Sequence, residues 1–386
     1  MNSVARPRRL LLALYFASVA LVTVQQAILG HSNNLSIFRS ASLNLFAGRD
    51  LYAAHPEQHF DFYKYSPTFA LLFAPLAYLP FALAFLCWAL LNGLLLWYAL
   101  DRLLPEREAT VALALLYLEV LLALQYGQSN ALVAALMILA FVAFEGRHQL
   151  GAALSITGGA AVKLFPLAAL SLAIFHPRRL RFAAIFSAVL AVAVLLPLVA
   201  VSPAELLAQY RSWRAIEAKD ALLRGYSLMH YTHAWLGVGW PNWPQQAAGT
   251  ALLLLPLALR SDGWASLEFR RLFLCSLLVY SVLFNHASES PSFIVAYTGI
   301  VIWYASSPPS RLRTAIMALT LLVMVVHDVD VVPRWVKYDV LVPYRIKGIP
   351  CLVAWFVMQW ELLFDARSTP PLDPNSFPAP PPTADA

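Results

Sequence analysis

Long apolar stretches separated by short polar joints occupy almost the whole sequence and restrict what the chain can fold into. About 20 apolar residues cross a bilayer as a helix, since lipid offers the backbone no hydrogen-bond partner and a helix satisfies its own. Such stretches begin near residues 10, 82, 109, 129, 149, 182, 247, 272, 291, 311 and 350. The 386 residues are 60% hydrophobic and 12% charged, which excludes a soluble protein. We therefore predict an all-α, polytopic integral membrane protein, a bundle of roughly nine to eleven transmembrane helices.

Basic residues in the joints predict the orientation of this bundle, because Lys and Arg are enriched in cytoplasmic loops. Arg6, Arg8 and Arg9 precede the first apolar stretch, so residues 1–9 are expected inside. Residues 10–365 then form a multi-pass domain of the cytoplasmic membrane, followed by a disordered, proline-rich cytoplasmic tail at 366–386. Counting crossings places the chemically rich loops outside the membrane: 31–67, 125–130, the long loop 202–244, 285–291 and 327–347.

This alternation requires a helix break between residues 151 and 175. Gly158, Gly159 and Pro166 surround Lys163 there, and glycine and proline both weaken a helix. A lysine within an apolar run costs a few kcal/mol unless it is paired or hydrated. We interpret Lys163 as a point charge for a lipid phosphate at the outer face, the alternative being an amine that only extends to the interface.

Several classes of function lack their sequence signals. Cys87, Cys275 and Cys351 fall inside apolar stretches, too few and too scattered for a disulfide framework or a metal site. The net charge of +6 is dispersed among the joints, so nucleic acid is not an expected partner. The chain contains neither a P-loop nor a dinucleotide fingerprint, so a soluble nucleotide donor is not expected either.

The first outer loop contains two candidate catalytic carboxylates, Asp50 and Asp61, close to Lys64 and Tyr65. The loop enters a helix through Ser66-Pro67, a typical N-cap followed by proline at the first helical position. A carboxylate near a helix start is held in place, as general-base catalysis requires. The alternative for each carboxylate is an ordinary solvated turn residue.

Polar side chains in the other outer loops suggest where a sugar and its phosphate would bind. Amides recognise hydroxyl groups without the cost of burying a charge, which makes Gln128 and Asn130 candidates, unless they only form a helical turn. In the long loop, Arg211 and Arg214 are candidates to assist Lys163, unless they belong to a salt-bridged surface helix.

Histidines occur in two further outer segments. Tyr226 and His230 are candidate substrate contacts, and His233, three positions after His230, lacks the further ligands of a zinc site. His286 and Glu289 lie together at a helix joint, where a substrate pocket and a structural polar turn are about equally well supported. Glu289 is the third candidate catalytic carboxylate.

The order of these motifs is similar to that of a known family. The series Gly48–Tyr52, Tyr65-Ser66-Pro67, Gly127–Asn130, Lys163–Pro166, Tyr226–Leu228 and Ser290-Pro291 resembles the family 87 glycosyltransferases, which are similar to polyprenol-phosphate-mannose-dependent mannosyltransferases of the GT-C fold. The resemblance covers most of residues 10–365. It implies a hexosyltransferase that moves a sugar, typically mannose, from a polyprenyl phosphate to a lipid-linked or envelope glycan acceptor outside the membrane. Neither a cofactor nor a metal is implied, since Lys or Arg can stabilise the leaving phosphate.

One position departs from the family pattern. In the mannosyltransferases a carboxylate is expected early in the first outer loop, where this chain has Asn34. An amide is not a useful base, so Asp50, Asp61, Glu289 or His286 serves instead, or the activity is altered. Two rival functions therefore stay open: a transporter or flippase of a lipid-linked sugar, and an inactive membrane scaffold.

Overall fold

A computed structural model describes residues 5–328 and 332–365, and these residues form helices without any strand. The predicted disordered tail lies outside the described residues. The α-helices are α1 (Ala5–Thr23), α2 (Asn33–Phe46), α3 (Pro67–Leu72), α4 (Ala74–Ala77), α5 (Phe81–Leu103), α6 (Glu106–Gln125), α7 (Asn130–Glu145), α8 (Gln149–Val162), α9 (Arg179–Leu195), α10 (Pro203–Asp220), α11 (Leu228–Leu236), α12 (Asn242–Leu259), α13 (Leu267–Leu283), α14 (Phe293–Ser306), α15 (Arg311–Asp328) and α16 (Gly348–Phe364). Short 3-10 or π-helical segments join them: η1 (Val24–Ile28), η2 (Phe165–Phe175), η3 (Leu196–Val199), η4 (Ser261–Ala265), η5 (Ser290–Ser292) and η6 (Val336–Leu341).

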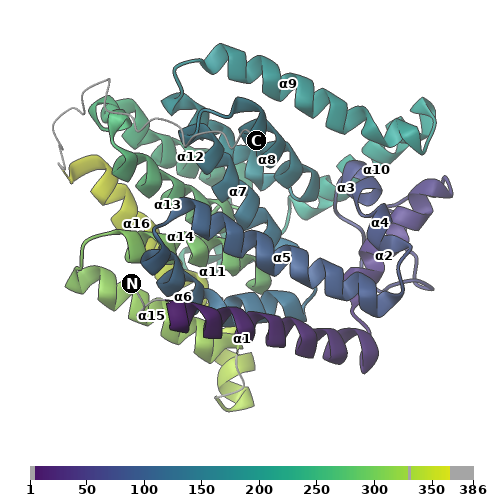
Figure 1. Cartoon of the computed structure of the whole chain (residues 1–386), viewed down its shortest axis with the longest axis horizontal. Coiled ribbons are helices and arrows are strands. Elements are labelled where there is room, and N and C mark those ends of the chain that lie inside the picture. Colours follow the sequence, from purple (N-terminus) through teal and green to yellow (C-terminus); the bar gives the residue numbers. More distant parts are fainter. Residues whose placement is uncertain (1–4, 329–331, 366–386) are drawn as a thin grey trace, which may run out of the picture.

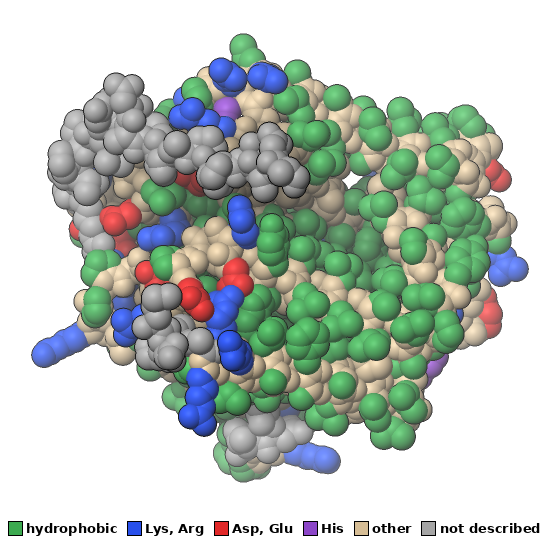
Figure 2. All heavy atoms as spheres, viewed as in Figure 1, with side chains coloured by type: hydrophobic (Ala, Val, Ile, Leu, Met, Phe, Trp, Pro, Cys, Tyr) green, Lys and Arg blue, Asp and Glu red, His purple; other side chains and the backbone are tan. Residues whose placement is uncertain are grey.

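The helices have the length and composition of a membrane protein. Among the described residues, four helical spans are long and apolar enough to cross a bilayer: Arg6–Ile28, Phe81–Leu103, Glu106–Gln125 and Arg179–Val199. Shorter apolar helices accompany them. Figure 2 shows hydrophobic side chains over much of one face, whereas charged side chains gather toward the side where the N-terminus and α16 lie. The chain is a helical membrane protein, and the predicted number of nine to eleven spans stays a prediction.

The centre of the bundle is α14, in which every residue from Phe293 to Trp303 is buried. It packs against α13, α6 and α7, and α16 contacts both α13 and α14. The helix α9 lies along one edge beside α8, with most of its apolar side chains exposed (Figure 1). In a bilayer such an outer apolar helix contacts lipid, so its exposed leucines and valines carry no penalty.

The two local predictions about helix ends are confirmed. Ser66 caps α3, because its hydroxyl accepts the Phe69 backbone N–H at 3.1 Å, and Pro67 follows at the first helical position. α8 ends at Val162, Lys163 is extended, and the chain continues as the 3-10 helix η2. A Cβ on Gly159 would lie 2.9 Å from the Cβ of Pro166, so the close approach of the two segments requires glycine there.

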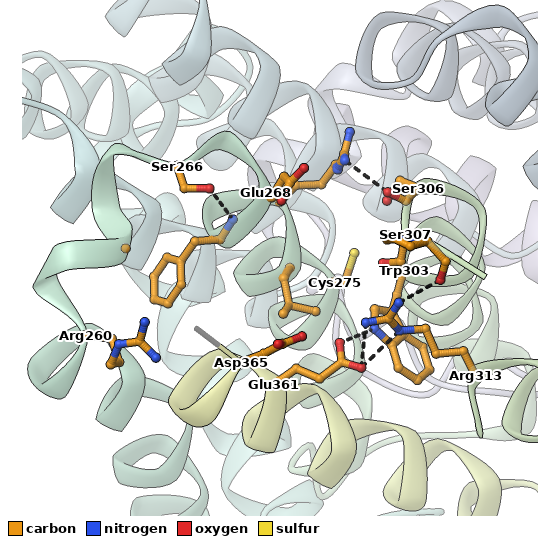
Figure 3. A pocket seen from close by; sticks show the side chains of 15 residues that line it. Arg260, Ser266, Glu268, Cys275, Trp303, Ser306, Ser307, Arg313, Glu361 and Asp365 are labelled. Carbon is orange, nitrogen blue, oxygen red and sulfur yellow. Dashed lines mark hydrogen bonds and ion pairs between the residues drawn. The ribbon is translucent and has the colours of Figure 1, made fainter. Parts of the chain in front are cut away.

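Several arginines lie near the beginning of α13, among them Arg260, Arg270, Arg271 and Arg313. Arg270 pairs with Glu145 on α7 at 2.6 Å, and Arg313 pairs with Glu361 on α16 at 2.8 Å. Figure 3 shows the small cavity at this end, about 80 Å³, where Glu361 points toward both Arg313 and Trp303. The groups at this end are largely paired with each other.

Candidate functional site

A larger cavity, of about 740 Å³, lies at the opposite end of α13. The loop before α3, the end of α8, the helix α10 and the segments around Tyr226 and His286 all contribute to its wall. Its polar lining includes Asn34, Asp61, Lys64, Tyr65, Gln128, Lys163, Glu217, Asp220, Arg224, Tyr226, His230, Gln246, His286, Glu289 and Arg345. Most of the predicted site residues therefore meet in one space.

The loop before α3 carries Asp61 and Lys64 into the cavity and is tied to α10. Nζ of Lys64 lies 3.0 Å from the Asp220 carboxylate, and the Lys64 carbonyl accepts the Trp213 indole N–H at 3.2 Å. Burial opposes the charged form of Lys64, but the hydrogen bond and charge of Asp220 outweigh it and raise the pKa of this amine. Asp61 forms no ion pair with a described residue, and its carboxylate accepts only the adjacent Phe62 N–H, at 2.7 Å.

α10 turns one face toward the cavity. Trp213, Glu217 and Asp220 follow helical spacing and all line it. Burial and then repulsion from Asp220 raise the pKa of Glu217. Arg211 and Arg214 are exposed on the same helix and do not line the cavity, so the structure does not place them beside Lys163.

Lys163 has no carboxylate partner among the described residues. Its Nζ donates to Oδ1 of Asn130 at 2.8 Å, and Nδ2 of Asn130 donates to the Pro291 carbonyl at 3.0 Å. Asn130 is buried and positions Lys163 rather than lining the cavity itself. The result is an amine fixed at the cavity wall, without a direct ion pair among the described residues and within reach of an anion in the cavity.

The joint between α13 and α14 contributes both of its predicted residues. Glu289 caps η5, where its carboxylate accepts the Ser292 N–H while the Ser292 hydroxyl accepts the Glu289 N–H at 3.2 Å. Nε2 of Gln246 donates to Nδ1 of His286 at 3.1 Å, which assigns the ring proton to Nε2. Burial lowers the pKa of His286, so this imidazole is a neutral N–H donor at neutral pH.

A close backbone crossing brings Tyr226 to this joint. A Cβ on Gly225 would lie 2.2 Å from the Ser288 carbonyl oxygen, and that carbonyl accepts the Tyr226 N–H at 2.9 Å. Only glycine fits there, with its φ of +41°. His230 follows one helical turn later; its Nε2 is buried without a hydrogen-bond partner, and burial followed by the charge of Arg345 lowers its pKa.

Asp50 does not line the cavity. Its carboxylate accepts the Tyr52 N–H at 3.0 Å and the Ser212 hydroxyl at 3.1 Å. The side chain of Gln209 binds the neighbouring backbone on both sides, accepting the Leu51 N–H and donating to the Arg49 carbonyl. The Gly48–Tyr52 segment therefore fastens the loop between α2 and α3 to α10. Asp61 and Glu289 are the predicted catalytic carboxylates that reach the cavity.

Asn34, at the position where the family pattern has a carboxylate, also lines the cavity. Its Nδ2 donates to the Tyr126 carbonyl at 2.7 Å, which fixes the amide at the start of α2. Gln128 lies nearby in the lining, and its side chain makes no hydrogen bond with a described residue. Both amides can offer polar atoms to a hydroxylated ligand.

The lining residues that sequence reasoning overlooked include Trp213, Gln246 and Arg345. Helical spacing from Asp220 and Glu217 would have indicated Trp213. No local signal pointed to Gln246 or Arg345, because only the packing of distant helices brings them to the cavity. Among residues 5–328 and 332–365, no group of three or more His, Cys, Asp or Glu has the arrangement of a metal site.

The cavity combines two kinds of chemistry. Lys163 and Arg345 are cations without carboxylate partners among the described residues, and such groups stabilise an anionic leaving group. Asp61 is a carboxylate at the same cavity, able to take a proton from a hydroxyl group that the amides orient.

Comparison with known proteins identifies a family. The sequence model of glycosyltransferase family 87 matches residues 62–285, which is more than half of the chain and includes most segments of the cavity wall. No curated protein matches the chain significantly.

Proposed function

The chain belongs to glycosyltransferase family 87, and from this we propose that it transfers a hexose, with mannose as the first candidate, from a polyprenyl phosphate to a lipid-linked or envelope glycan acceptor. We place the reaction at the extracytoplasmic face of the cytoplasmic membrane. The observation that supports this function is the cavity in which Asp61 and Glu289 face Lys64 and Lys163.

The reaction is a direct displacement. A carboxylate takes the proton of the acceptor hydroxyl as its oxygen forms a bond to the anomeric carbon. The bond between that carbon and the phosphate oxygen breaks, and the electron pair leaves with the lipid phosphate. Lys163 faces the growing negative charge, and the amides of Asn34 and Gln128 orient sugar hydroxyls.

Asp61 is the better candidate base of the two carboxylates in the lining. The Glu289 carboxylate is engaged in the capping box of η5, which gives it a structural task. Asp61 has a single hydrogen bond, from its neighbouring amide, and its remaining lone pairs are available to a substrate. A general base contributes about 10²- to 10⁴-fold to a rate, which sets the expected loss on its removal.

The test is a transfer assay with purified protein in detergent, radiolabelled polyprenyl-phosphate mannose and native membrane lipids. Wild-type protein should yield a labelled lipid or glycan product. Asp61→Asn should lower its rate by about 10²-fold or more at unchanged melting temperature. Asp262→Asn is the matched control, since Asp262 is exposed beyond the opposite end of α13.

Two results would contradict the proposal at different levels. Full activity of Asp61→Asn would reject Asp61 as the base and move the role to Glu289. Label that crosses the bilayer of proteoliposomes without any new glycosidic bond would reject glycosyl transfer and support a flippase.

A further inference from the structure

Arg345 lines the cavity in a backbone conformation that residues with a Cβ rarely adopt. Its φ is +54°, in the left-handed region. Such a conformation persists only where the surrounding structure enforces it, and it often marks a functional position.

The turn that contains Arg345 is anchored on two sides. The Arg345 carbonyl accepts the Tyr231 hydroxyl at 2.6 Å and the Gly348 N–H at 3.1 Å. Two positions later, Lys347 is fully buried and pairs with Glu119 on α6, at 3.3 Å, and with Asp328 at the end of α15. These contacts fix the backbone at Arg345 to the helices behind the cavity.

The side chain of Arg345 lacks a partner of opposite charge among the described residues. Its guanidinium lies over the Tyr226 ring, with Cζ 4.4 Å from the ring centre, which holds it at the cavity wall. Its Nε is buried without a hydrogen-bond acceptor, and Nε2 of His230, also in the lining, is likewise unsatisfied. A buried N–H of a charged group without an acceptor is unfavourable, so this corner of the cavity is suited to an anion.

We propose that Arg345 binds the phosphate of the lipid-linked sugar, an assignment that rests on the proposed glycosyl transfer. A guanidinium offers two parallel N–H bonds to phosphate oxygens, whereas Lys163 supplies a single point charge. The donor phosphate is a diester with one negative charge, and the departing lipid monoester carries about −1.5 to −2 at pH 7. Arg345 therefore binds the product phosphate more tightly than the donor, which favours departure of the leaving group.

The experiment measures binding of farnesyl phosphate, a short lipid monophosphate, against uncharged farnesol, with full-length protein in detergent. Wild-type protein should bind farnesyl phosphate more tightly. Arg345→Gln should weaken farnesyl phosphate roughly 10- to 150-fold, the range expected for hydrogen bonds to a charged group, and leave farnesol unchanged. Arg334→Gln is the matched control, because Arg334 is exposed and does not line the cavity.

A second variant protects the test against misfolding. Arg345→Gly removes the guanidinium and suits the left-handed backbone, so it should stay folded and show the same loss for farnesyl phosphate. Unchanged farnesyl phosphate binding in Arg345→Gly, or no preference for the phosphate in wild-type protein, overturns the proposal. If wild-type protein binds the phosphate through Arg345 but forms no glycosidic bond, the proposed function fails while this assignment holds.

Discussion

Replacing Lys347 with methionine should destabilise the protein more than any surface change. The amine is 1% exposed and pairs with the carboxylates of Glu119, which is 3% exposed, and Asp328, which is 10% exposed. It is also within 3.4 Å of the Ser290 hydroxyl. Methionine fills the same volume but leaves both carboxylates without their cation.

The expected magnitude follows from this burial. Removing one partner of a buried ion pair costs about 3–5 kcal/mol, because the remaining charge stays desolvated and uncompensated. Glu119→Gln removes one of the two carboxylate charges that Lys347→Met would leave without a lysine partner. The loss caused by Lys347→Met should therefore be smaller in a Glu119→Gln background, and the difference is the coupling between the two residues.

The free energy of unfolding can be followed by circular dichroism while SDS replaces a mild detergent. Lys219→Met is the matched control, since Lys219 is exposed on α10 and should change stability by less than about 0.5 kcal/mol. A Lys347→Met protein within about 1 kcal/mol of wild type would refute the argument from buried charge. Equal losses with and without Glu119→Gln would refute the coupling.

Three further predictions concern the cavity wall. Gly225→Ala should lower the melting temperature and the transfer rate together, since its Cβ would collide with the Ser288 carbonyl; an alanine variant with wild-type properties would contradict this. Asn34→Asp should cost about 0.5–1.5 kcal/mol, because it removes the hydrogen bond that the amide donates to the Tyr126 carbonyl at the solvent-accessible wall, and an unchanged free energy of unfolding would contradict it. Burial raises the pKa of Glu217, so the folded state binds the proton of this carboxyl more strongly than the unfolded state does. The protein therefore loses stability as pH rises from 4.5 through the raised pKa, because a buried charge replaces the neutral carboxyl. Glu217→Gln should therefore stabilise the protein at pH 7 but not at pH 4, and an equal effect at both values would exclude this cause.

Local patterns in the sequence were sufficient to predict much of the helical architecture. Ser66-Pro67 forms the cap that its residue types predict, and the helix breaks at Lys163 between Gly159 and Pro166. Both features depend on residues within one or two turns, so neighbouring side chains and backbone hydrogen bonds decide them. The same holds for the apolar stretches that form helices of a membrane protein.

The selection among candidate site residues depended on contacts between distant segments. Asp50 and Asp61 both lie in the loop between α2 and α3, yet Ser212 and Gln209 bind the segment around Asp50, so only Asp61 of the two reaches the cavity. A loop has no repeating geometry from which to infer side-chain direction. Its conformation follows from whichever distant helix satisfies its polar groups.

By itself, the sequence determined a helical membrane protein with polar joints, since each apolar stretch must satisfy its own backbone in lipid. Only the tertiary structure decided which joints share a cavity and which charges in it lack a partner. Arg345 illustrates the difference, because its left-handed backbone is imposed by Tyr231 and the buried Lys347. Those contacts join residues far apart in the chain, so no local sequence pattern predicts them.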